Sequence, residues 1–98
     1  MSTSISQLQE LVLDFVTDKH ESVSSIEDEV RLLLGNGVSR QQMNAAFEEL
    51  RELRFVEAYL YLEDAAKFER FRRPKLKKGM VMWWRATSEG QRWRELNP

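Results

Sequence analysis

The chain has 98 residues, 42% of them hydrophobic and 32% charged, which predicts a single domain, residues 1–98, with one hydrophobic core. The absence of cysteine excludes a disulfide framework, a thiolate nucleophile and a thiolate metal site. The net charge is only −1, no apolar run approaches the ~20 residues that span a bilayer, and no signal-peptide pattern opens the chain. We therefore expect a cytoplasmic protein with no membrane contact.

A first helix is predicted close to the N-terminus. Ser4 or Ser6 can cap it, because a glutamine lies three residues after each serine and completes a capping box. The apolar residues behind the cap recur at helical spacing and form one stripe: Ile5, Leu8, Leu11, Val12, Phe15 and Val16. The stripe ends in the polar residues 17–20, and residues 22–25 are predicted to form a loop.

Two more helices are predicted on either side of a short turn. The second begins at Ser24 or Ser25 and ends at the Gly35-Asn36-Gly37 sequence, which readily adopts left-handed conformations. Its predicted buried face is Ile26, Val30, Leu33 and Leu34. Ser39 caps the third helix through Gln42, and the predicted core stripe is Met43, Ala46, Phe47, Leu50 and Leu53. The turn between them is short enough for a helix–turn–helix pair.

After Arg54 the apolar period changes from 3.6 to 2, which is typical of strands. Residues 56–62 alternate as in a half-buried strand, and residues 80–87 are a second strand candidate. Between them, residues 64–79 contain either a short helix capped by Asp64 or part of a long, frayed hairpin, and the pattern leaves both open. A final helix begins at Thr87 or Ser88.

Charge is divided along the chain. Residues 1–64 hold 13 acidic and 5 basic side chains, whereas residues 65–98 hold 10 basic and 3 acidic ones. Seven of these cations lie close together, opposed only by Glu69: Lys67, Arg70, Arg72, Arg73, Lys75, Lys77 and Lys78. Such a segment attracts anionic partners, although a charged loop can also serve solubility alone.

Two short motifs, with the order of the predicted elements, carry a resemblance to a known family. The sequence from Arg85 to Gly90, RATSEG, is similar to the LTxEG motif that closes the wing in winged-helix regulators of the MarR and PadR type. Residues 50–57 are similar to the exit from the third helix in those families, except that Arg54 stands where glycine is frequent. The resemblance implies an α+β winged helix: a three-helix helix–turn–helix core, a two-stranded hairpin wing and a short C-terminal helix.

The resemblance implies a DNA-binding or transcription-regulator-like protein that places its third helix in the major groove of double-stranded DNA and its wing on phosphates. The outward face of that helix, however, carries three carboxylates among Gln41, Ala45, Glu48, Glu49 and Glu52. The helix therefore argues against major-groove reading, and the basic segment argues for phosphate contact. The candidate nucleic-acid-binding residues are Arg40, Asn44, Arg51, Arg70, Arg72, Arg73, Lys75, Lys77 and Lys78.

The strand register gives an alternative function. If Ala86 faces the core, Met82 and Trp84 do so too, and the opposite face presents Tyr59, Tyr61, Trp83 and Arg85. These four residues are a candidate interface for another protein or a second copy of the chain, without DNA binding.

No catalytic site, metal site or cofactor is predicted. The single histidine, His20, has only Asp18 and Glu21 beside it, which is a thin ligand set, and a solvated loop position is expected for it. No serine lies in a nucleophile motif. An enzyme is therefore not expected.

Overall fold

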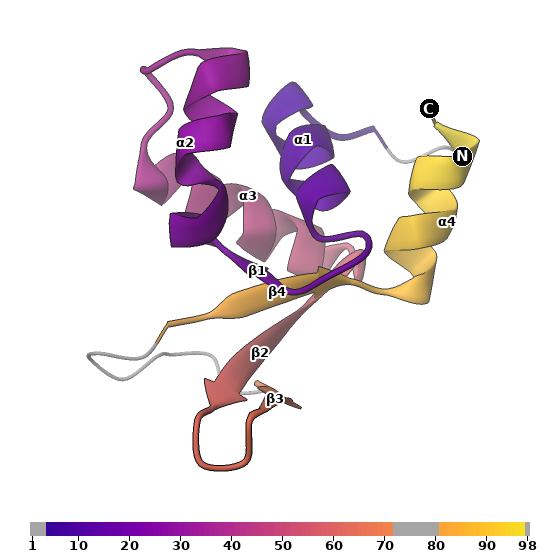
Figure 1. Ribbon diagram of the computed structural model, residues 1–98. Coiled ribbons are helices and arrows are strands. Elements are labelled where there is room, and N and C mark those ends of the chain that lie inside the picture. Colours follow the sequence, from indigo (N-terminus) through magenta and orange to yellow (C-terminus); the bar gives the residue numbers. More distant parts are fainter. Residues whose placement is uncertain (1–3, 72–80, 98) are drawn as a thin grey trace.

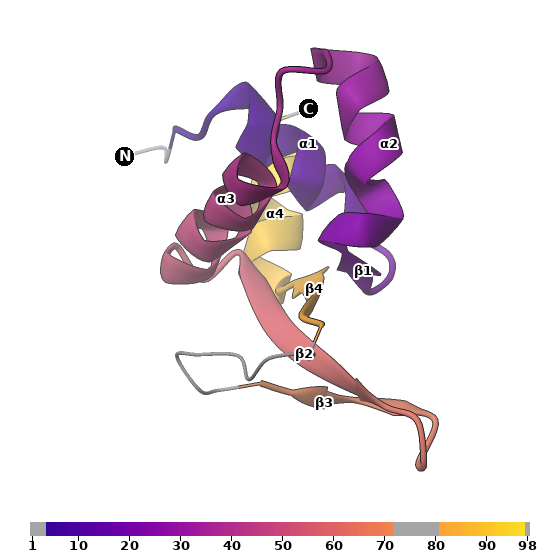
Figure 2. The same cartoon turned by 90° about the vertical axis from the view of Figure 1, so that its left-hand side faces the viewer.

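The computed structural model describes residues 4–71 and 81–97 of the chain. Its elements are α1 (Gln7–Phe15), β1 (Glu21–Ser22), α2 (Val23–Leu34), α3 (Arg40–Glu52), β2 (Val56–Leu62), β3 (Lys67–Arg70), β4 (Trp83–Ala86) and α4 (Ser88–Leu96). The strands form one antiparallel sheet in the order β1-β4-β2-β3. Helices α1, α2 and α3 lie on one side of the sheet, and β2 and β3 extend away from them as a hairpin (Figure 1, Figure 2). The predicted α+β class is confirmed.

Helices α1 and α3 begin where the sequence predicts. Ser6 and Gln9 form a reciprocal capping box, in which the Gln9 amide donates to Ser6 Oγ at 3.1 Å and the Ser6 amide donates to Gln9 Oε1 at 2.7 Å. Ser39 and Gln42 form the same arrangement at the start of α3. Each box satisfies two backbone donors that a helix N-terminus otherwise leaves unpaired.

The predicted start of α2 was wrong. The helix is capped by Ser22, whose Oγ accepts from the Ser25 amide at 3.2 Å, while Ser25 Oγ accepts from the Ser22 amide at 2.9 Å. Ser22 also pairs with Trp83 in the sheet. The predicted loop over residues 22–25 is therefore instead the last residue of β1 followed by the first residues of α2. The predicted end was right, because Gly35 has a φ of +102°.

The core lies between the three helices and the inner face of the sheet. Its centre is the Trp84 ring of β4 stacked on Phe47 of α3, with ring centroids 5.0 Å apart and planes 4° from parallel. The helices contribute the fully buried side chains Val12, Leu13, Val16, Val30, Met43 and Leu50. Two predicted core residues lie outside it: Leu33 is 62% exposed beside Leu32, and Leu53, just after α3, is 39% exposed. Leu33 lies near the C-terminus of α2, and Leu53 directly follows α3.

The sheet is larger than the predicted two-stranded hairpin. Residues 67–70 form β3, which pairs with the outer half of β2 and places Phe68 opposite Tyr61. Of the two alternatives for residues 64–79, the short helix is wrong, since the chain turns at residues 63–66, with Ala66 at a φ of +49°, and continues as β3. An aromatic cross-strand pair of this kind stabilises antiparallel strands. Strand β4 begins at Trp83, later than the predicted residue 80, which lies outside the described residues.

None of the helices in the described ranges is long and apolar enough to cross a membrane.

Candidate nucleic-acid interface

The outward face of α3 has the orientation that helical geometry predicts. All five side chains assigned to it are exposed: Gln41, Ala45, Glu48, Glu49 and Glu52. Asn44 is exposed as well. Glu49 accepts a hydrogen bond of 2.8 Å from Gln9 Nε2 of α1, so one of the three carboxylates also joins two helices.

The first arginine of α3 is held by an acidic partner. Arg40 forms a two-pronged ion pair with Glu27 of α2, in which Nη2 lies 3.1 Å from Oε1, and Arg31 lies 3.4 Å from the same carboxylate. The hydrogen bond from Arg40 lowers the pKa of Glu27 below its ordinary value, and Glu27 in turn raises the pKa of Arg40. Arg40 thus joins α2 to α3.

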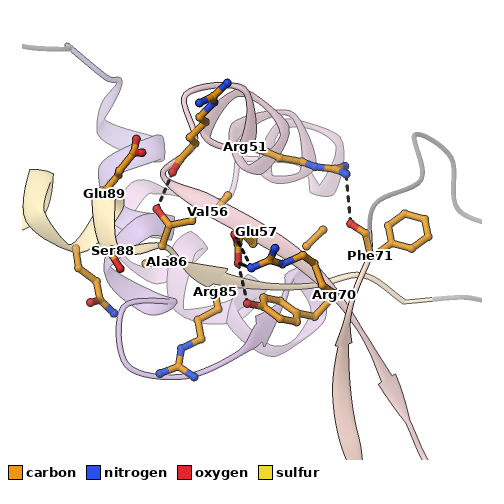
Figure 3. A pocket seen from close by; sticks show the side chains of 14 residues that line it. Arg51, Val56, Glu57, Arg70, Phe71, Arg85, Ala86, Ser88 and Glu89 are labelled. Carbon is orange, nitrogen blue, oxygen red and sulfur yellow. Dashed lines mark hydrogen bonds and ion pairs between the residues drawn. The ribbon is translucent and has the colours of Figure 1, made fainter.

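The other end of α3 opens onto a groove of about 720 Å³ between that helix, the sheet and the start of α4 (Figure 3). Among the described residues, four arginines line it, and we call this set the arginine groove: Arg51, Arg54, Arg70 and Arg85. Two carboxylates of the described residues, Glu57 and Glu89, line the same groove. The local charge is therefore positive by two, although the chain as a whole is slightly acidic.

Arg54 has a left-handed backbone conformation, with a φ of +65°. The turn is fixed by the C-terminal segment: Thr87 Oγ1 donates to the Arg54 carbonyl at 2.6 Å, and the Thr87 amide donates to the Phe55 carbonyl at 2.9 Å. Gly90 lies against the same backbone, where an added Cβ would be 2.1 Å from the Phe55 oxygen. The left-handed region is unfavourable for a side chain with a Cβ, which explains why glycine is frequent here in the resembling families.

Arg51 and Arg70 are held in the groove by partners of their own. Arg51 Nη2 donates to the Phe71 carbonyl at 3.4 Å and lies 3.8 Å from Glu48 through Nη1, so it links α3 to the end of β3 (Figure 3). Arg70 Nη2 lies 3.0 Å from Glu57 Oε1. Both contacts leave the guanidinium groups partly exposed to solvent.

Tyr59 lies beside this ion pair. Its hydroxyl donates to Glu57 Oε2 at 2.9 Å (Figure 3). Burial, followed by the bond to the Glu57 carboxylate, raises the pKa of Tyr59 above its ordinary value. The hydroxyl is therefore a neutral donor at physiological pH.

Arg54 and Arg85 differ from the other two groove arginines. Within residues 4–71 and 81–97, neither side chain has a carboxylate at ion-pair distance. The charge of Arg85 nevertheless acts on its surroundings, because it helps burial to lower the pKa of His20. Two unneutralised guanidinium groups beside two tethered ones can bind phosphate oxygens with charge-assisted hydrogen bonds.

The groove contains two of the predicted nucleic-acid-binding residues, Arg51 and Arg70. Arg40 and Asn44 do not line it. The remaining five candidates, at positions 72, 73, 75, 77 and 78, lie outside the described residues. Sequence reasoning missed Arg54 as a site residue and assigned Arg85 to a protein interface. The substitution of arginine for the frequent glycine at position 54 was the available signal.

The opposite face of β2 and β4 from the core carries an aromatic cluster. The predicted orientation of Tyr59, Tyr61, Trp83 and Arg85 is confirmed, since Trp84 and Ala86 are buried and Met82 packs against the core. Phe68 of β3 partly covers these rings, with its centroid 5.0 Å from Tyr61 and 5.5 Å from Trp83. Of the three predicted rings, Tyr61 is the one that remains well exposed, at 44%.

His20 belongs to the same cluster and is not the solvated residue that the sequence predicts. Its ring stacks on Phe68 at 3.9 Å and meets the edge of Tyr59 at 4.5 Å. Its Nε2 atom is buried without a hydrogen-bond partner among the described residues. Burial, with a smaller effect of Arg85, lowers the pKa of His20 from 6.5. The imidazole therefore acts as a neutral ring that joins the α1–β1 loop to β3.

Comparison with known proteins bears on the fold. A mutant of ZitR from Lactococcus lactis has a similar structure, with a TM-score of 0.63 over 96% of this chain and 13% sequence identity. The fold is a winged helix. The winged-helix chain spans about half the length of that ZitR chain, 51% of which is covered. No family model matches the sequence, and no curated protein matches it. Within the winged helix, α2 and α3 are the helix–turn–helix pair, and β2 and β3 begin the wing.

Proposed function

We propose that this winged-helix chain binds double-stranded DNA through backbone phosphates that enter the arginine groove. The observation that supports the proposal is that four arginines, from α3, the turn after it, β3 and β4, line one groove. Phosphate contacts of this kind position a protein on a duplex without reading its sequence. The basic segment at residues 72–78 follows the groove directly in the chain and extends the proposed contact.

The conformation of Arg54 supports the proposal independently. A left-handed backbone costs a residue with a Cβ roughly 1–2 kcal/mol, and glycine would avoid that cost. The chain has arginine there, beside Arg85, which also lacks a carboxylate partner among the described residues. Backbone strain that is retained next to a charged groove is typical of a functional position.

In the proposed complex, α3 does not lie deep in the major groove. Its carboxylates at 48, 49 and 52 would face the phosphates there, and like charges oppose that approach. We expect the C-terminal end of α3 to approach the phosphate backbone through Arg51, with little direct reading of bases. Arg40 and Asn44 stay candidate contacts at the other end of the helix.

A salt titration tests this function. Fluorescence anisotropy of a labelled duplex should show affinity that falls with salt, with a slope of about −0.9 for each phosphate neutralised. The double variant Arg54→Ala, Arg85→Ala should lower the affinity and flatten the slope. The matched control is Lys19→Ala, Arg92→Ala, which removes the same charge from exposed positions outside the groove and should leave the slope unchanged.

Changing Arg72, Arg73, Lys77 and Lys78 together to alanine tests the basic segment and should flatten the slope further. Absence of duplex binding at low salt, even at tens of micromolar protein, would contradict the proposal. An equal loss of affinity in the groove variant and in its control would contradict the role of the groove.

A second candidate function, association with another protein, is favoured by α2. Leu32 and Leu33 are 84% and 62% exposed next to each other at the end of that helix. Adjacent exposed leucines are a small apolar patch of the kind that partners cover. Sedimentation of the wild type against Leu32→Ser, Leu33→Ser would reveal self-association through this surface.

A further inference from the structure

A second hollow, of about 690 Å³, lies where β2 extends past the end of β4. Tyr61 and Trp83 line it together with three aliphatic side chains, Leu60, Leu62 and Val81, and with one carboxylate, Glu63. Ser24, an exposed residue in the first turn of α2, adds a hydroxyl group to the same wall. The hollow therefore combines flat rings with a hydrogen-bonding group, and we call it the aromatic hollow.

The exposed surface of the aromatic hollow is small, and the ring of Tyr61 forms part of it. Tyr61 is 44% exposed and Val81 is 54% exposed, while Trp83 is half-buried. Stable protein interfaces bury about 800 Å² on each partner, which far exceeds what the lining of this hollow exposes. A nucleobase is a flat group about as large as one aromatic side chain, and stacking on such a ring is favourable for every base.

The aromatic hollow and the arginine groove are related through neighbouring residues of the sheet. Tyr59 lines the groove, and its neighbour across the sheet, Trp83, lines the hollow. Glu57 in the groove and Tyr61 in the hollow are four residues apart on the same face of β2, which corresponds to about 13 Å along the strand. A nucleic-acid strand whose phosphates lie among the four arginines can therefore reach the rings within a few nucleotides.

The rings are also held in place before any ligand arrives. Phe68 packs against both Tyr61 and Trp83 from β3, and the stacked imidazole of His20 supports Phe68 from the other side. Strand pairing places Tyr61 directly opposite Phe68. A stacking surface that is already ordered loses little side-chain entropy when it binds, which favours affinity.

We propose that the aromatic hollow binds an unpaired nucleobase of the same DNA molecule whose phosphates lie in the arginine groove. The inference rests on the proposed function and refines its ligand: a duplex that carries a single-stranded extension is preferred over a blunt duplex. Tyr61 supplies the stacking face, and Trp83 flanks it. The phosphate contacts hold the strand, and the ring binds the first accessible base beside them.

Two labelled DNA probes test the proposal on the full chain: a blunt duplex, and the same duplex with a single-stranded thymine extension. We expect the extension to tighten binding by about tenfold, a typical gain from stacking one base. Tyr61→Phe keeps a flat ring and should keep that gain. Tyr61→Leu keeps apolar volume without a ring and should lose it, while the affinity for the blunt duplex stays unchanged.

Two measurements guard this test against a folding defect. Circular dichroism of Tyr61→Leu should match the wild type, and Glu95→Gln, at an exposed position of α4 that lines neither the groove nor the hollow, should retain the tenfold gain. In the wild type, the extended probe should quench tryptophan fluorescence more than the blunt one. Trp83→Phe should remove that difference, because Trp84 and Trp93 do not line the hollow.

The possible results separate the two proposals. Equal affinity for both probes, with blunt-duplex binding intact, would overturn the inference and leave the proposed function standing. Binding of neither probe would overturn both. A wild type that sediments as a dimer, dissociates on Tyr61→Leu and ignores the extension would mean that the hollow holds a second copy of the chain.

Discussion

The arginines at the two ends of α3 differ in their ion-pair partners. At the N-terminal end, Arg40 is bound by Glu27 of the neighbouring helix, and the exposed face that follows is acidic. At the C-terminal end, four arginines share a groove with two carboxylates, and two of the four have no ion-pair partner within the described residues. Sequence position on a helix thus says little about whether a cation is available to a ligand. The partners that the rest of the fold brings to it decide that.

Gly90→Ala is expected to disrupt the arginine groove most strongly, although it changes no arginine. In most helices this change stabilises by about 1 kcal/mol. Here the added Cβ would meet the Phe55 carbonyl at 2.1 Å, a backbone atom that cannot move aside cheaply. We expect a net loss of about 3 kcal/mol in the free energy of unfolding, measured by urea denaturation, together with loss of DNA affinity. Gly37→Ala is the control, because open space surrounds the equivalent Cβ and stability should stay nearly unchanged.

A matched pair at position 54 separates charge from backbone strain. Arg54→Ala and Arg54→Gly remove the same guanidinium, so both should weaken duplex binding equally and reduce the salt slope by about 0.9 if one phosphate contact is lost. Only glycine relieves the φ of +65°, so Arg54→Gly should be more stable than Arg54→Ala by about 1 kcal/mol in thermal unfolding. A glycine variant that binds DNA like the wild type would show that Arg54 has no role in binding.

Changes to the acidic outward face of α3 should have a smaller effect on DNA binding. The triple change Glu48→Gln, Glu49→Gln, Glu52→Gln leaves side chains of the same shape, and the new amide oxygen at position 49 could still accept from Gln9. We expect the fold to remain intact and non-specific DNA binding at low salt to tighten about twofold to threefold, since like-charge repulsion near the phosphates is removed. Tightening of a hundredfold would mean that α3 lies against the duplex after all; unchanged affinity would place this face away from DNA.

The smallest expected effect is a change in melting temperature in mild acid. The folded-state pKa of His20 is lowered from 6.5, so its contribution to stability is present above that value and is lost as the pH falls through the folded pKa. Glu27 has a lowered pKa too, but its contribution is lost only at a more acidic pH, below 4.5. We expect a slight fall in melting temperature just below pH 6.5 that His20→Phe abolishes and Glu27→Gln does not. A melting temperature that rises as the pH falls through this range would contradict the assignment.

How far the sequence predicts this molecule depends on how local each signal is. The caps at Ser6 and Ser39 follow from a serine and a glutamine three residues apart, and the inward position of Trp84 follows from strand alternation. The cap at Ser22 was missed because several serines in a row can each begin a helix, and pairing with β4 selects among them. Strand β3 was missed because its four residues gain their conformation from β2.

The candidate site was harder to predict than the fold. Four arginines line the groove, and no local pattern relates Arg51 and Arg54, at the end of α3, to Arg70 and Arg85 in two later strands. The ion pair between Arg40 and Glu27 likewise depends on how α2 packs on α3. The alternation of side chains along β2 and along β4 is a local signal. It correctly predicted the face of the sheet on which Tyr61 and Trp83 lie.

The hydrogen bond from Thr87 to the Arg54 carbonyl joins residues 33 positions apart in the chain. During synthesis, the turn that directs Arg54 can acquire this bond only after Thr87 and the residues of α4 have left the ribosome. A growing chain that already contains all three helices of the helix–turn–helix core would still lack a finished groove. Non-local contacts of this kind form late and slow folding, so the ability to hold phosphate should appear only once the chain is complete through α4.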